Sequence, residues 1–198
     1  RQLFEVIAQD AFAVVPRDLN WLVTMHLAGL TAIHLADVDR SATLLDLLRP
    51  FGGLDATHGS GYASYGPVGR VVAGLAATTG AWDEAAHWFE LVLSTRSPGP
   101  WTTLTRLDRA AARLPSRARA DDLADVERSI DELRAWDLDL RADEADGFAS
   151  QLRREGGASH AAVYHEGRWD LVHPAGVATV ADSTGMRSLV ALLERAGT

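Results

Sequence analysis

Two residue types that carry much of protein chemistry are missing from this chain, cysteine and lysine. With no cysteine, disulfides, thiolate metal sites and cysteine nucleophiles are excluded. All 19 basic residues are arginine, which excludes a P-loop lysine and a Schiff-base lysine within the chain. No apolar run reaches the roughly 18 residues that a membrane-spanning helix needs. We therefore expect a cytoplasmic protein without membrane contacts.

The remaining composition is that of an ordinary globular protein. In 198 residues, 47% are hydrophobic and 23% are charged, which is enough for one or two domains with a buried core. The first residue is Arg1 rather than methionine, and no basic-then-apolar leader precedes the first helix. We expect the chain to be part of a longer polypeptide.

The net charge of -8 is concentrated in one segment. From Arg119 to Asp146 there are eleven acidic residues and four arginines. Such a balance does not favour phosphate contacts, so we expect no nucleic-acid binding by this chain alone. The segment is interpreted as the solvated face of a surface helix, with an acidic docking face for a basic partner as the alternative.

The strongest architectural signal lies between Leu75 and Phe89. One helix ends at Gly80, and a second begins near Asp83 after a short turn. In the second helix Ala85 and Phe89 are four residues apart and share one face. A small residue followed by a large one, just after a glycine turn, is typical of the second helix of a tetratricopeptide-type hairpin.

A similar pattern occurs upstream and suggests a repeat. Ala42 matches Ala85 at a distance of 43 residues, whereas a standard tetratricopeptide unit has about 34. The excess fits an insertion in the glycine-rich stretch 51–67, which we expect to be a loop and the first place to look for function. Apolar spacing predicts helices over 2–15, 18–36, 39–48, 68–79, 83–95, 101–114 and 120–136.

The character of the chain changes after about residue 147. Short β-rich runs over 161–164, 169–173 and 177–180, separated by glycine turns, predict an antiparallel meander. A last helix is expected over 186–195. We thus predict a mostly α fold of TPR-like antiparallel hairpins, stacked in a right-handed superhelix over 1–147. A small α+β module over 148–198 would follow, interpreted as a truncated winged-helix-like domain.

Three stretches carry a family resemblance: His58 to Val68 with Gly74 to Ala77, Pro100 to Asp108, and Leu152 to Gly156 with Val180 to Leu189. They resemble the C-terminal helical region of large actinobacterial signalling ATPases. Those proteins have an AAA-type or STAND-type core, often joined to a LuxR-type regulator or an adenylate cyclase domain. The resemblance implies a helical-repeat sensor region and, in relatives, the start of a winged-helix-like output domain. The chain departs from relatives at Asp46, where they carry an aromatic residue, and at 179–184, where they are more basic.

The site candidates lie in the insertion and in the helices that follow it. His58 can donate or accept a proton near neutral pH, and tyrosines offer surfaces for stacking. A packed connecting loop is the alternative explanation. Our candidates for ligand or partner contact are His58, Ser60, Tyr62, Ser64, Tyr65, Arg70, Trp101 and Arg106.

No catalytic or metal site is expected. The histidines at 160, 165 and 173 match no zinc spacing, and the paired carboxylates lack the apolar pocket that acid catalysis needs. We expect a non-enzymatic, cofactor-free interaction or sensor module for a peptide, a partner domain or a small effector. Other domains of its parent chain and a second copy are further candidate partners. The alternatives are part of a DNA-binding winged helix, or a serine hydrolase acting through Ser60 or Ser64 with His58.

Overall fold

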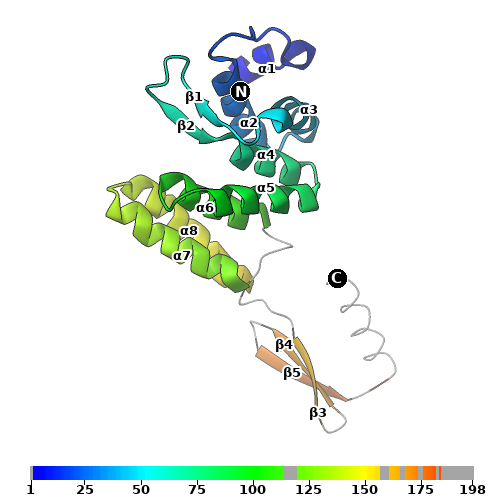
Figure 1. Ribbon diagram of the computed structural model, residues 1–198. Helices are drawn as coiled ribbons and strands as arrows, with labels where there is room; N and C mark the ends of the chain where they lie inside the picture. Colours follow the sequence, from blue (N-terminus) through cyan, green and yellow to red (C-terminus); the bar gives the residue numbers. More distant parts are fainter. Residues whose placement is uncertain are drawn as a thin grey trace. The chain divides into compact units, whose positions relative to one another are not determined.

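The computed structural model describes residues 2–113, 120–156, 161–165, 168–173, 176–181 and 183. Its internal contacts divide the chain into two units, Arg1–Phe148 and Ala149–Thr198, and each is described by itself. The first unit is built almost entirely of helices, which confirms the mainly helical fold (Figure 1). The right-handed superhelix stays a prediction.

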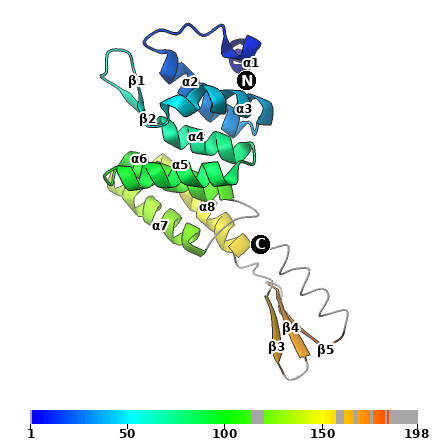
Figure 2. The same cartoon turned by 45° about the vertical axis from the view of Figure 1, so that its right-hand side comes forward.

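The helices of the first unit follow one another in antiparallel pairs (Figures 1 and 2). The elements are α1 (Gln2–Ile7), η1 (Gln9–Phe12), α2 (Trp21–His34), α3 (Val38–Leu48), η2 (Arg49–Phe51), β1 (Asp55–Thr57), β2 (Ser64–Pro67), α4 (Val68–Thr78), α5 (Trp82–Thr95), α6 (Pro100–Arg113), α7 (Ala120–Ala135) and α8 (Asp139–Gly156). Helix α8 was not predicted, and its residues after Phe148 belong to the second unit.

The first predicted helix, 2–15, is wrong beyond Ile7. Asp10, Ala11 and Phe12 have φ values of 47°, 53° and 66°, which a right-handed helix does not allow. The turn brings the buried rings of Phe4 and Phe12 to a centroid distance of 6.1 Å. Burial of both rings in one place outweighs the cost of the left-handed residues.

Three helices end in the same way. In α2, α4 and α7 the second residue beyond the helix has a left-handed backbone, with φ of 50° at Ala36, 82° at Gly80 and 57° at Asp137. Each end has the paired hydrogen bonds of a Schellman motif, which satisfy carbonyls of the last turn. The long bonds run from Asp37 N–H to Ala32 C=O, from Ala81 N–H to Ala76 C=O and from Leu138 N–H to Leu133 C=O.

A small buried residue follows each of these turns after five positions. Ser41, Ala85 and Ala142 are at most 3% exposed, so the second helix of each pair can approach the first closely. The sequence match of Ala42 with Ala85 is therefore wrong by one residue, because Ala42 is exposed and Ser41 occupies the equivalent place. The reason is that Asp37 accepts the N-cap hydrogen bond from Arg40 N–H, which fixes where α3 begins.

The repeat makes a prediction for Ser41, whose buried hydroxyl has no hydrogen-bond partner among the described residues. Ser41→Ala should raise the free energy of unfolding by about 1 kcal/mol, because it removes an unsatisfied polar group and places the alanine of the other two pairs there. Urea unfolding measures this. Ser94→Ala, at an exposed position of α5, is the control and should gain only a few tenths of a kcal/mol. Equal gains at both positions would contradict the packing explanation.

The glycine-rich stretch 51–67 is not a plain loop. Strands β1 and β2 form an antiparallel hairpin in which Asp55 pairs with Pro67 and Ala56 with Gly66, with an irregularity before Thr57. Ala56 is fully buried, and β1 contacts α2. The two strands were missed because they are short and lack an apolar alternation.

Helix α4 is the centre of the first unit. It contacts α2, α3, α5 and α6. All of its residues from Val68 to Ala77 are buried except Arg70. Gly74 allows close approach to α2, since a Cβ there would lie 2.6 Å from Ile33. Between Val68 and Ala77, Arg70 is thus the one side chain of α4 that is partly exposed.

The second unit contains the predicted meander. Strands β3 (Ala161–His165), β4 (Arg168–His173) and β5 (Gly176–Ala181) form an antiparallel sheet in the order β3-β4-β5, which confirms the predicted strands. The expected last helix, 186–195, and the histidine at 160 lie outside the described residues. The winged-helix interpretation depends on those residues and stays a prediction.

Candidate binding groove

The first unit has a cavity of about 490 Å³ between α2, the β1–β2 hairpin, α4, α6 and the first half of α8. We call it the groove. Its lining combines large apolar and aromatic side chains with two ion pairs. The residues are Leu30, Ser64, Tyr65, Arg70, Trp101, Leu104, Leu107, Asp108, Ala111, Arg141, Glu144, Ala145 and Phe148.

Helix α6 supplies the longest wall of the groove. Trp101, Leu104, Leu107 and Ala111 recur at intervals of three and four residues, so they share one helix face. The opposite face carries Thr102, Thr103 and Ala110, which are buried. One helix thus contributes to the core and to the groove at the same time.

Trp101 is held in place by a glycine of the hairpin. A Cβ at Gly66 would lie 2.6 Å from the Trp101 ring, so the backbone of β2 packs directly against the indole. Gly66 also has a φ of 98°, which favours glycine. The neighbouring Tyr65 is 36% exposed and lies at the same wall. The hairpin therefore positions two aromatic side chains at the groove.

The most enclosed charge in the groove is Arg70. Its side chain is 11% exposed, and its Nε donates a hydrogen bond of 2.5 Å to Asp108 Oδ2. No other described group accepts a hydrogen bond from this guanidinium, and its Nη atoms are not among the buried unpartnered atoms. The four Nη–H donors of Arg70, a residue that lines the groove, thus have no hydrogen-bond partner among the described residues. At the rim, Arg141 pairs with Glu144 at 2.8 Å, and both side chains are largely exposed.

His26 lies behind the groove wall, one helical turn before Leu30. Its side chain is fully buried, and neither ring nitrogen has a hydrogen-bond partner among the described residues. Burial, together with the positive charge of Arg70, lowers the pKa of His26 to about 4. The backbone of Tyr65 and the carboxylate of Asp55 act in the opposite direction on this pKa but are weaker.

The predicted site residues lie in three separate places: the groove, the tip of the β1–β2 hairpin, and the contact between α6 and α7. Ser64, Tyr65, Arg70 and Trp101 line the groove. Ser64 Oγ also accepts the N–H of Gly66 at 3.2 Å, so it acts as a turn residue.

His58, Ser60 and Tyr62 form a separate cluster at the tip of the hairpin. The His58 and Tyr62 rings are 4.8 Å apart, and His58 Nδ1 lies 3.3 Å from Ser60 Oγ. Tyr62 is 76% exposed. No described carboxylate contacts His58, so the orienting third member of a catalytic triad is not found in the described part of the chain. The cluster is an exposed surface feature outside the groove.

Arg106 lies between α6 and α7 rather than in the groove. It pairs with Glu132, and its Nη2 donates to Thr103 Oγ1 at 3.1 Å. Two further arginines of α6 also form ion pairs with acids of α7: Arg109 with Asp125 at 2.5 Å, and Arg113 with Asp122 at 2.6 Å. Three acids of the 119–146 segment therefore neutralise arginines of α6, and Asp122 is only 1% exposed. The interpretation as a wholly solvated acidic face is wrong at these positions.

Several groove residues were not predicted. Leu104 and Leu107 could have been found from the apolar spacing of α6. Arg141, Glu144 and Phe148 could not, because α8 itself was missed. Its buried positions within the first unit are alanines, Ala142 and Ala145, which give a weak apolar signal.

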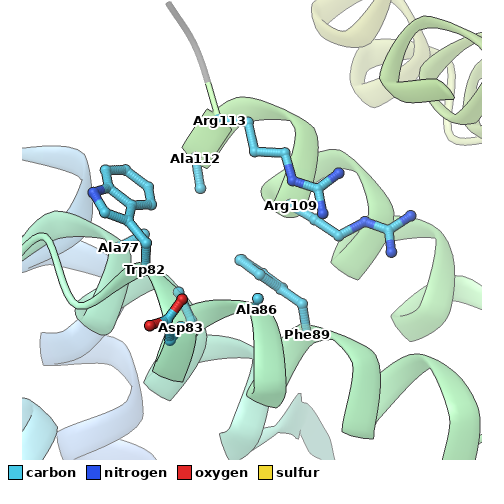
Figure 3. Close-up of a pocket in the computed structure, with 9 residues that line it drawn as sticks. Ala77, Trp82, Asp83, Ala86, Phe89, Arg109, Ala112 and Arg113 are labelled. Atoms are coloured by element: carbon cyan, nitrogen blue, oxygen red, sulfur yellow. The ribbon is translucent and has the colours of Figure 1, made fainter. Parts of the chain in front are cut away.

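A smaller cavity of about 130 Å³ lies between α5 and α6 (Figure 3). Trp82 and Phe89 border it from α5, and the stems of Arg109 and Arg113 from α6. Figure 3 shows both guanidinium groups pointing away from the space, side by side. Since acids of α5 and α7 already bind them, these two arginines offer a ligand little free charge.

Comparison with family models, with curated proteins and with solved structures gives no match for this chain. In the described part of the chain, no group of three or more metal-ligating side chains comes together. Nor does any described helix combine the length and the apolar character needed to cross a membrane.

Proposed function

We propose that this chain is a non-catalytic interaction module, in which the groove binds a peptide segment of a partner protein or of another domain of its parent chain. The observation that carries this proposal is the groove itself. Its volume of about 490 Å³ and its mainly aromatic and apolar lining, joined by two ion pairs, are typical of binding sites. The likeness to the sensor regions of signalling ATPases supports a role in regulating such an ATPase or a transcriptional regulator.

The composition of the groove favours binding over chemistry. Trp101 and Tyr65 are residue types that dominate binding energy in protein interfaces. They lie on a helix and on a hairpin that the core holds in place, so little conformational entropy is lost on binding. The charged groups of the groove are arginines and carboxylates in ion pairs.

The test is selection of a displayed random peptide library on the whole chain. Peptides that bind through the groove should lose affinity by about tenfold or more with Trp101→Ala, because truncation of a central tryptophan typically costs about 2 kcal/mol. Titration calorimetry of the enriched peptides measures the loss. Trp136→Ala is the matched control, since Trp136 is 37% exposed at the α7–α8 turn and does not line the groove. Absence of any peptide sensitive to Trp101→Ala would contradict the proposal.

A further inference from the structure

We propose that the groove selects an acidic peptide segment, in which a large apolar side chain enters the cavity and a neighbouring aspartate or glutamate carboxylate binds the Nη groups of Arg70. This inference rests on the proposed function and specifies the chemistry of the partner. It follows from the state of Arg70, from its surroundings and from the other charges of the groove.

Arg70 has unused hydrogen-bonding capacity in an enclosed place. A guanidinium has five N–H donors, and Arg70 uses only Nε, in its bond to Asp108. At 11% exposure little water reaches the side chain, so an incoming acceptor replaces few water contacts. A carboxylate is the acceptor that matches the planar fork of two Nη groups, and charge-assisted pairs of this kind are the strong ones.

Asp108 orients the guanidinium rather than saturating it. It binds only Nε, so both Nη groups are left without an acceptor among the described residues. Asp108 is 37% exposed, so water already screens part of its charge. The two halves of this ion pair should therefore have opposite effects on an acidic peptide: Arg70 attracts it and Asp108 repels it.

The apolar part of the peptide is set by the neighbours of Arg70. Tyr65, Trp101 and Leu104 lie around the same cavity, and Leu30 and Phe148 complete its apolar surface. A side chain such as phenylalanine or leucine fits this lining, and its burial adds affinity that does not depend on charge. The rim pair of Arg141 and Glu144 is exposed and self-neutralising, so it contributes little to charge selection.

The experiment uses three capped peptides that differ at one residue: Gly-Phe-Glu-Gly, Gly-Phe-Gln-Gly and Gly-Phe-Lys-Gly. Each is titrated into the whole chain, and the indole N–H signal of Trp101, assigned with Trp101→Phe, gives the dissociation constant. We expect the Glu peptide to bind about tenfold more tightly than the Gln peptide, with the Lys peptide weakest.

Two variants locate the effect at Arg70. Arg70→Gln should abolish the preference for Glu over Gln, and Arg70→Lys should keep only part of it, because an ammonium lacks the fork. Asp108→Asn should maintain or increase affinity for the Glu peptide. If the ion pair were merely structural, Arg70→Gln and Asp108→Asn would weaken binding alike, and that result would overturn the inference.

The three peptides are compared on the wild-type chain, so this test does not depend on whether any variant folds. Equal binding of the Glu and Gln peptides, tightest binding of the Lys peptide, or no binding of any of the three overturns the inference. The library selection separates this failure from failure of the proposed function. If peptides sensitive to Trp101→Ala are found but carry no acidic residue, the groove is a binding site and only the carboxylate preference is wrong.

Discussion

Acidification from pH 6.5 to about pH 4 should destabilise this protein by about 3 kcal/mol through His26 alone. The imidazole is fully buried, and burial with the nearby charge of Arg70 lowers its pKa from 6.5 to about 4. In the unfolded chain the imidazole takes up a proton as the pH falls through 6.5, whereas in the folded chain it stays neutral. The unfolded state is thus favoured progressively in this window, and the effect levels off below about pH 4.

Urea unfolding at a series of pH values measures this loss. Carboxylates also titrate near the lower end of the window, so the quantity of interest is the difference between the wild-type protein and His26→Leu. The variant should lack the part of the pH dependence that begins near pH 6.5. His34→Leu is the matched control, because His34 is an exposed histidine near the C-terminal end of the same helix. Parallel profiles for the wild-type protein and His26→Leu would show that His26 is not held neutral.

The pKa of His26 should also respond to binding in the groove, because two groove residues, Arg70 and Tyr65, act on this pKa. Arg70 lowers the pKa of His26, and the backbone of Tyr65 lies near its ring. A carboxylate bound to Arg70 would offset part of that positive charge, so the pKa of His26 should rise when an acidic peptide binds. This arrangement could not be predicted from the sequence, because Arg70 and Tyr65 are far from His26 along the chain.

The helical pairs were predictable where a residue type marks the turn. Gly80 ends α4 visibly in the sequence, and Ala85 and Phe89 follow at the right spacing. The same turn at Ala36 and Asp137 is made by residues that rarely adopt a left-handed backbone, so no glycine marks it. This explains why the repeat register was wrong by one residue and why α8 was missed.

The groove was only partly predictable for a related reason. The sequence indicates Tyr65 because tyrosines of the insertion offer stacking surfaces, and Trp101 because tryptophans of a helical repeat can line its concave face. Their meeting depends on the β1–β2 hairpin, which folds the insertion back onto α6. The pairing of short strands depends on tertiary packing more than on local sequence. The far wall belongs to α8 and required the full structure.

The hairpin itself can be tested at Gly66, where Gly66→Ala should lower the free energy of unfolding by about 3 kcal/mol. Two causes add. An alanine at a φ of 98° is strained, and its Cβ would lie 2.6 Å from the Trp101 ring. Gly61→Ala separates them, because Gly61 has a φ of 77° but nothing within 4 Å, so it should cost only about 1 kcal/mol.

The contribution of the ring is then measured by a double-mutant cycle between Gly66→Ala and Trp101→Ala. If the Cβ collides with the indole, removal of the indole makes Gly66→Ala cost no more than Gly61→Ala. If Gly66→Ala lowers the free energy of unfolding by the same amount in the Trp101→Ala background, β2 does not pack against the indole. The hairpin would then not be what positions this wall of the groove. Gly66→Ala should also weaken groove-dependent peptides, because the indole must move to make room, whereas Gly61→Ala should leave their affinity unchanged.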